Sequence, residues 1–150
     1  MNLREDFLAA GPLLIDRLKA ELPPTVFVLS AKDLSGVKEA AQQAPAVHVV
    51  YQSFAPKQGA GGAWSGIEQT WLTVAVVRNV SSLAGAEAPM ADAGPLMSGI
   101  VNALLMWVPA GHADFQGIHL KPSPPAGYTR AGFAYFPIAW GLDLRIRRGR

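Results

Sequence analysis

The sequence predicts an α+β fold, an antiparallel or mixed sheet of four to five strands with helices packed on one face. Two patterns carry this prediction. Residues 133–146 alternate apolar with other side chains, which indicates a long strand laid against a core. Residues 95–108 repeat apolar side chains at helical spacing, which indicates a core helix. With the shorter elements, the predicted order is α-β-α-β-β-α-β-β in a single domain, residues 1–150.

Composition limits the class of protein. A chain of 150 residues buries about 68–70% of its unfolded surface as one domain. Half of the residues are hydrophobic and 16% are charged, whereas about 25% are charged in typical soluble domains. This apolar excess favours an oligomer. A net charge of +2 is too small to indicate a nucleic-acid partner, and no apolar run is long enough to span a membrane.

The N-terminal third is predicted to contain two helices and a strand. A helix broken or kinked at Gly11-Pro12 is expected over residues 3–21, because Pro12 suits the first turn of a new helical segment. Residues 25–29 are β-branched and aromatic, so they predict a strand. A short helix is expected over residues 34–41.

The middle of the chain predicts a long hairpin. Residues 46–54 and 67–80 alternate as strands do, and the glycine-rich segment 55–66 between them predicts a loop that projects from the sheet. Residues 81–90 are small and polar and predict a second loop.

The C-terminal part predicts the core. Pro95 is expected to open the main helix, residues 117–121 to form a short strand, and residues 133–146 to form the last strand. Pro137 indicates an edge, a bulge or a break there, because proline cannot donate to a ladder. One row of this strand is apolar throughout: Ala134, Phe136, Ile138, Trp140, Leu142, Leu144 and Ile146. The other row is apolar only at its start, which favours contact with another subunit.

Catalytic patterns are missing from the sequence. His112, Asp114 and His119 form the one cluster worth testing, but their spacing matches no metal signature. The absence of cysteine excludes a thiolate metal site and disulfides. We therefore predict no enzyme activity, cofactor or metal. A small ligand-binding or metal-dependent enzyme domain stays open as the alternative from a different class.

Candidate interface residues lie in the glycine-rich loop, on the outer row of the last strand and in the basic C-terminal tail. An aromatic on a loop tip is often a contact anchor, although local packing explains Trp64 equally well. The arginines suit an acidic partner surface, whereas a solvated tail that protects an edge strand is the alternative. The candidates are Lys57, Gln58, Trp64, Tyr135, Arg145, Arg147 and Arg148.

Five segments spread over most of the chain resemble phage tail terminator proteins of long-tailed bacteriophages and prophages. They are residues 26–34 (VFVLSAKDL), 45–51 (PAVHVVY), 69–79 (QTWLTVAVVRN), 94–97 (GPLM) and 132–140 (GFAYFPIAW). The resemblance is one of overall pattern and transfers no individual contact residue.

The resemblance implies a non-enzymatic α+β protein of the virion, made in the host cytoplasm. It implies a homo-hexameric ring on the head-proximal end of the tail tube, which stops tube polymerisation and joins the tail to the head. The implied partners are the protein itself, the tail tube protein and a head-completion or connector protein. DNA passes only as cargo through the lumen. A neck or head-completion protein on the connector side is the alternative within the same assembly.

Overall fold

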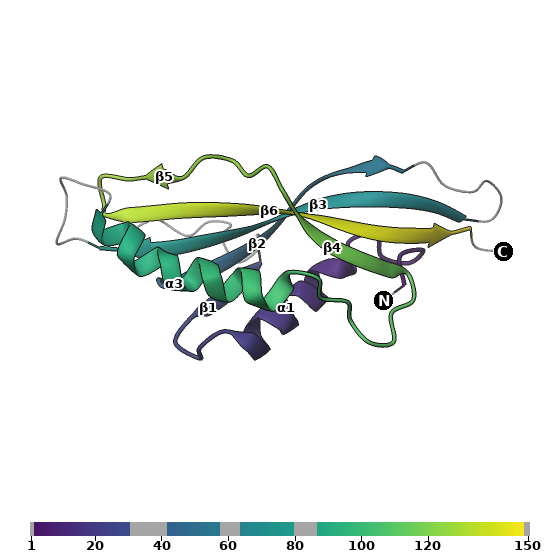
Figure 1. Ribbon diagram of the computed structural model, residues 1–150, viewed down its shortest axis with the longest axis horizontal. Helices are drawn as coiled ribbons and strands as arrows, with labels where there is room; N and C mark the ends of the chain where they lie inside the picture. Colours follow the sequence, from purple (N-terminus) through teal and green to yellow (C-terminus); the bar gives the residue numbers. More distant parts are fainter. Residues whose placement is uncertain (1, 31–41, 58–63, 80–86, 149–150) are drawn as a thin grey trace.

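A computed structural model describes residues 2–30, 42–57, 64–79 and 87–148 (Figure 1). Within these ranges the fold consists of two helices and one six-stranded mixed sheet, so the predicted α+β class is confirmed. The strand that the prediction missed, Gly127–Tyr128, has only two residues, too few to show a periodicity in the sequence. The elements are α1 (Ala10–Glu21), β1 (Phe27–Ser30), β2 (Ala46–Pro56), β3 (Trp64–Arg78), α3 (Glu87–Leu104), β4 (Phe115–Lys121), β5 (Gly127–Tyr128) and β6 (Phe133–Arg147).

The sheet has the strand order β1-β2-β3-β6-β4, and β5 pairs separately with the start of β6. Only β1 and β2 run parallel, and the other pairs are antiparallel. The predicted β2–β3 hairpin is confirmed, and β3 pairs with β6 along the full 15 residues of each. Strands β2 and β4 each carry a bulge, at Tyr51/Ser53 in β2 and at Phe115/Gly117 in β4.

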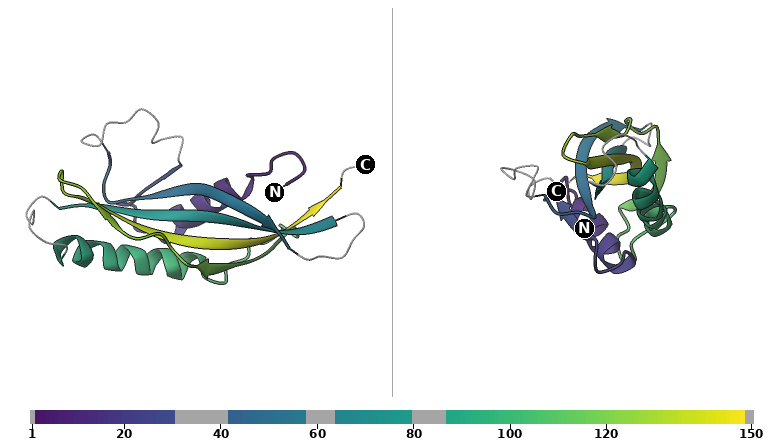
Figure 2. Two further views of the ribbon diagram at one scale, coloured as in Figure 1. Left: turned by 90° about the horizontal axis from the view of Figure 1, so that it is seen from above. Right: turned by 90° about the vertical axis from the view of Figure 1, so that its left-hand side faces the viewer.

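Both helices pack on the same face of the sheet, and one hydrophobic core lies between the two layers (Figure 2). The predicted packing of the last strand on the main helix is confirmed, because the apolar row of β6 lies in one buried cluster with Leu96, Ile100 and Leu104. Trp140 is fully buried, and its indole Nε1 donates to Thr73 Oγ1 at 2.9 Å. This hydrogen bond satisfies the polar atom of the largest side chain in the core.

Helix α1 begins later than predicted. Residues 3–9 form turns, and the helix runs without a break from Ala10 to Glu21. Gly11 and Pro12 therefore lie in its first turn, where a proline is tolerated because its missing N–H has no intrahelical partner. Gly11 has a packing reason as well. A Cβ at this position would lie 2.8 Å from the ring of Trp71, so glycine lets the helix approach the sheet closely.

Helix α3 begins earlier than predicted, at Glu87 rather than at Pro95, and it ends at Leu104. The segment before Pro95 is rich in alanine and has Met90 as its one large apolar residue, so it lacks the repeated apolar spacing that marks a core helix. Leu105 and Val108 belong to the predicted core helix 95–108, and this prediction is wrong for them. Both follow the helix, and they are 44% and 50% exposed.

The strands around the predicted loop also differ from the prediction. Strand β2 continues to Pro56 and β3 already begins at Trp64, so the connection is shorter than the predicted residues 55–66. Pairing with β6 extends β3 in this way, since Trp64 is opposite Arg147. The predicted helix at residues 34–41 lies outside the described residues.

Pro137 lies in an unbroken β6, so of the three interpretations the break is excluded and the edge holds locally. On one side Pro137 is opposite Val74 of β3. On the other side it falls in the gap between β4, which pairs up to Ala139, and β5, which pairs from Tyr135. In this gap Ser123 Oγ accepts a hydrogen bond from the Ala139 N–H at 2.9 Å.

The face of the sheet opposite the helices is called the open face below. No helix in the described part of the chain covers it (Figure 2). The register places apolar side chains across its middle and charged side chains towards the end where β6 finishes. The open face therefore holds the candidate surfaces.

Candidate assembly surfaces

The hairpin end consists of the last residues of β2, the start of β3 and the end of β6. It brings several predicted residues together. The guanidinium carbon of Arg145 lies 4.4 Å from the centre of the Trp64 ring, a cation–π contact. Arg147 is opposite Trp64 in the ladder, and its Nε is 4.0 Å from a carboxylate oxygen of Asp114. Trp64 is thus a strand residue stacked by an arginine and not part of a loop tip.

One of the four remaining predicted residues also belongs to the hairpin end. Lys57 follows β2, and its N–H donates to the Gly66 carbonyl at 2.9 Å, so it belongs to the hairpin end. Arg148 is exposed just beyond β6. Tyr135 lies ten residues from Arg145 along β6, which is about 33 Å, and its hydroxyl hydrogen-bonds to Gln42 Oε1 at 3.0 Å. Gln58 lies outside the described residues.

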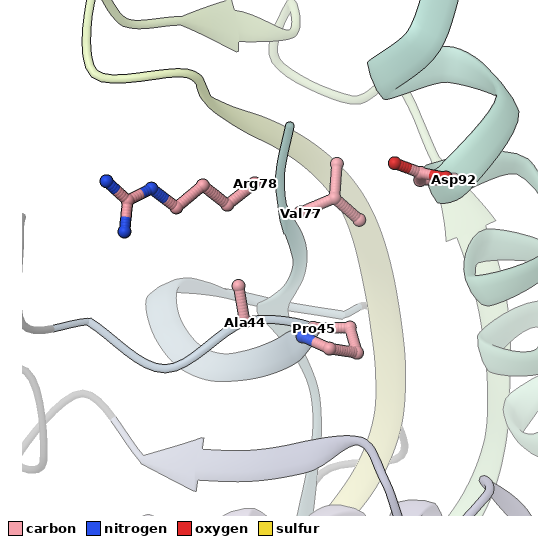
Figure 3. Close-up of a pocket in the computed structure, with 5 residues that line it drawn as sticks. All are labelled: Ala44, Pro45, Val77, Arg78 and Asp92. Atoms are coloured by element: carbon pink, nitrogen blue, oxygen red, sulfur yellow. The ribbon is translucent and has the colours of Figure 1, made fainter. Parts of the chain in front are cut away.

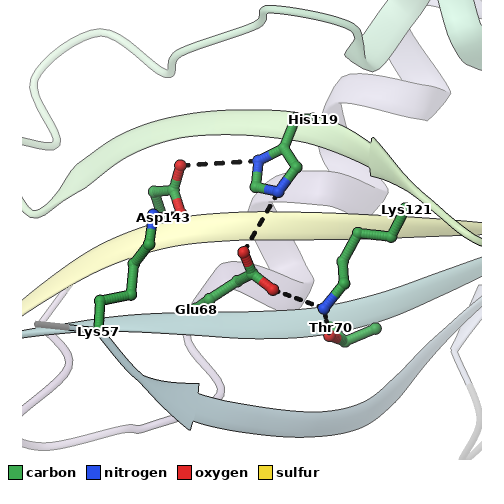
Figure 4. Close-up of polar contacts among 6 residues, drawn as sticks. All are labelled: Lys57, Glu68, Thr70, His119, Lys121 and Asp143. Carbon is green, nitrogen blue, oxygen red and sulfur yellow. Dashed lines mark hydrogen bonds and ion pairs between the residues drawn. The ribbon is translucent and has the colours of Figure 1, made fainter.

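An ion-pair network crosses the open face beside the hairpin end (Figure 4). His119 lies between two carboxylates, with Nε2 3.2 Å from Glu68 and Nδ1 3.6 Å from Asp143. Lys121 contacts the second oxygen of Glu68, and Lys57 contacts the second oxygen of Asp143, both at 2.5 Å. Lys121 also donates to Thr70 Oγ1 at 2.9 Å. These contacts join side chains from β3, β4, β6 and the end of β2.

A glycine lets one side chain of the network cross a neighbouring strand. The Lys57 side chain crosses β3 without this need, because a Cβ on Gly66 would lie 3.5 Å from the Lys57 Cβ, which is an ordinary contact. The ring of His119 lies against Gly141, where a Cβ would be only 2.5 Å from Nε2. A glycine inside a strand is a sequence signal for such a close approach. The sequence does not show which side chain approaches, because that depends on the pairing of β4 with β6.

Charge within the network is balanced. Two carboxylates face two ammonium groups, so the cluster is neutral when His119 is neutral. The hydrogen bond from Lys121 lowers the pKa of Glu68, with smaller lowering effects from the charges of Lys121, His119 and Lys57, while burial opposes them. Glu68 is therefore held as a carboxylate in the folded protein.

In the described residues, His112, Asp114 and His119 do not come together as one group of neighbouring ligand atoms. In the described ranges, the one group of three such ligands with atoms within 4.8 Å of one another is Glu68, His119 and Asp143. Both of its carboxylates already bind lysine ammonium groups, which removes the negative charge that would attract a cation. The ion pairs join neighbouring strands, and the charge of each carboxylate is balanced by a lysine.

A shallow pocket of about 320 Å³ lies at the other end of the sheet (Figure 3). Its lining residues are Ala44, Pro45, Val77, Arg78 and Asp92. Arg78 points away from the pocket centre, and its guanidinium carbon lies 5.0 Å from the centre of the Phe133 ring. Asp92 accepts a hydrogen bond from the Asn79 amide at 3.1 Å. The two charged groups thus act separately, and they do not form an acid–base pair.

Comparison with known proteins identifies the class. The model of the family described as phage tail terminator protein matches residues 4–150, nearly the whole chain. A match of this extent defines a structural protein of phage virions. The chain belongs to the phage tail terminator protein family.

Among solved structures, the chain is similar to a chain of the "Virion of native gene transfer agent (GTA) particle". The two share 13% identity over 92% of this chain and 88% of the other, with a TM-score of 0.44. The search of curated proteins gives no match. Neither helix that the structure describes is both long and apolar enough to cross a membrane.

Proposed function

We propose that the protein forms a homo-hexameric ring on the head-proximal end of the tail tube. The ring stops tube polymerisation by covering the growing end with a surface that the next tube subunit cannot use. Its opposite surface joins the head connector, and DNA passes through the lumen as cargo. The observation that carries this proposal is the family match over residues 4–150. Family membership also favours a non-enzymatic role.

The geometry supports a role in contacts between proteins. The sheet has a face without a covering helix in the described residues, and the hairpin end presents exposed basic side chains next to an aromatic ring. Arg147 is 60% exposed, and its Nε lies 4.0 Å from a carboxylate oxygen of Asp114. Such a distance leaves Arg147 able to bind a carboxylate on another subunit.

Deleting the gene in its phage or prophage tests the proposal. We expect tails of excessive length without attached heads, because nothing stops the tube or offers a surface to the connector. Electron micrographs give tail length and head attachment, and a plasmid copy of the gene should restore both. Tails of normal length that carry heads would overturn the proposal.

The hairpin end is tested by the triple variant R145S, R147S and R148S. We expect weaker assembly and a smaller effect of salt on it, because screened ion pairs are removed. The double variant R147S, R148S keeps the Arg145–Trp64 stack. A control variant removes three exposed basic residues elsewhere, Arg4, Lys19 and Arg130. If the triple and control variants assemble alike at low and high salt, the arginines are a solvated tail.

A further inference from the structure

An exposed apolar corner follows helix α3. Its residues Leu105, Met106 and Val108 are 44%, 83% and 50% exposed, and we call them the apolar knob. Of the exposed large hydrophobic side chains in the described residues, Met106 is the most exposed. The backbone beneath the knob is fixed, since the N–H groups of Leu105 and Trp107 bond back to the helix at 2.9 and 3.0 Å. The knob is thus a preformed feature of the surface.

The backbone of Met106 is unusual for its residue type. Its φ is +59°, in the left-handed region. Helices commonly end with one residue in this conformation, and that residue is usually glycine because a side chain is strained there. A methionine at this position costs stability, and its 83% exposure shows that packing within the subunit does not compensate. A strained, exposed apolar residue indicates a function for the side chain.

The open face carries a surface of matching character. Half-buried side chains from β2, β3 and β6 lie next to one another in the register and form an apolar patch: Val50, Leu72, Val74 and Pro137. A cavity of about 160 Å³ opens at its edge, lined by Val50, Val74, Val76 and Tyr135 with the polar Gln42 and His48. The patch itself has no charged side chain, so it fits an uncharged apolar occupant.

We propose that the apolar knob of one subunit docks on the apolar patch of a second copy of this chain. The segment from Leu105 to Pro109 has no charge, as the patch requires. The knob follows a helix on the covered face of the sheet and the patch lies on the open face (Figure 2). Two different surfaces on opposite faces make a head-to-tail contact, which produces a ring when the rotation closes. The inference rests on the proposed ring and adds the surfaces that build it.

The chain has no cysteine, so introduced cysteines report this contact directly. Three double variants combine Met106→Cys with Val50→Cys, Leu72→Cys or Val74→Cys. Each is introduced into the phage genome, and the tails that this phage produces are isolated. The sheet separates the two positions within a subunit, so a disulfide can form only between copies. After oxidation we expect a ladder up to the hexamer in at least one double variant. Met90→Cys with the same partners is the control, because Met90 is 51% exposed and lies on helix α3, away from the knob.

Each outcome bears on one level of the proposal. Dimers from Met106→Cys alone would mean a symmetric contact and overturn the inference. Rings that are visible on tail ends, but without a ladder in any of the double variants, would overturn the interface and leave the proposed function standing. If no rings are seen on wild-type tails, the proposed function fails and the interface with it.

A glycine variant separates assembly from folding. Met106→Gly relieves the left-handed backbone while it removes the side chain, so we expect a melting temperature equal to or above the wild type. Tail completion should fall by about tenfold or more, as for an anchor residue in an interface. Met90→Ala should leave tail completion unchanged. Normal tail completion with Met106→Gly would overturn the proposal.

Discussion

Replacing Gly141 by alanine should disrupt the ion-pair network on the open face. The new Cβ would lie 2.5 Å from Nε2 and 2.7 Å from Cε1 of His119, too close for two unbonded atoms. It would also lie 3.0 Å from Cδ of Lys121. The β6 backbone is held by pairing on both sides at this position, so the side chains must move. The ring of His119 is 44% exposed and can swing outward into solvent.

The cost follows from the contacts that His119 loses. Its contacts with Glu68 and Asp143 are partly exposed, and such pairs contribute about 0.2–1 kcal/mol each. Displacing Lys121 weakens a further hydrogen bond to Glu68. We therefore expect Gly141→Ala to lower the free energy of unfolding by about 1–2 kcal/mol.

A double-mutant cycle with His119→Ala isolates this cause. Without the imidazole, the new methyl group meets only the flexible Lys121 side chain, so Gly141→Ala should be neutral or slightly stabilising. Urea denaturation of the four proteins at pH 7 gives the coupling free energy, which we expect to be about 1 kcal/mol. An equal cost of Gly141→Ala with and without His119 would refute the reasoning.

Three further substitutions test the core and the network. Trp140→Ala should lower the unfolding free energy by about 3–5 kcal/mol, measured by denaturant, because it empties a fully buried site; an unchanged melting temperature would contradict this. Gly11→Ala should destabilise by about 1–3 kcal/mol despite the better helix propensity of alanine, and Trp71→Phe should reduce that loss by removing ring atoms from the contact. Glu68→Gln should cost about 1 kcal/mol at neutral pH, since a hydrogen bond to charged Lys121 is weakened. Because the pKa of Glu68 is lowered on folding, its stabilisation is complete above the unfolded value of about 4.3 and is lost as pH falls through the folded value. The variant should therefore lose less stability than the wild type between about pH 5 and pH 3, and parallel pH profiles would exclude this role.

The sequence predicts best where one pattern is long and uninterrupted. The apolar row of β6 is readable because every second residue from Ala134 to Leu144 faces the same core. The start of α3 cannot be predicted from such a pattern. Its first turns are rich in alanine, and Pro95, which is typical of the first position of a helix, lies inside this one.

The candidate surfaces were less predictable because they depend on which strands become neighbours. The stack of Arg145 on Trp64 joins residues about eighty positions apart, and only the β3–β6 register brings them together. The ion-pair network requires β4 to lie next to β6, which no local pattern in the sequence states. The apolar knob has a sequence signal in Leu105 and Val108, but helical spacing assigned those residues to the core.

The bulges in β2 and β4 bear on whether the sheet can take up a further strand. In the described residues β4 pairs only with β6, and β1 pairs with only the first four residues of β2, so both sides of the sheet present backbone groups that another chain can bind. A regular edge of this kind is a template for fibrils. The extra residues at Gln52 and Gln116 interrupt the hydrogen-bond spacing and twist each edge, which hinders a foreign strand from adding in register. Both bulges therefore disfavour aggregation of the protein through the edges of its sheet.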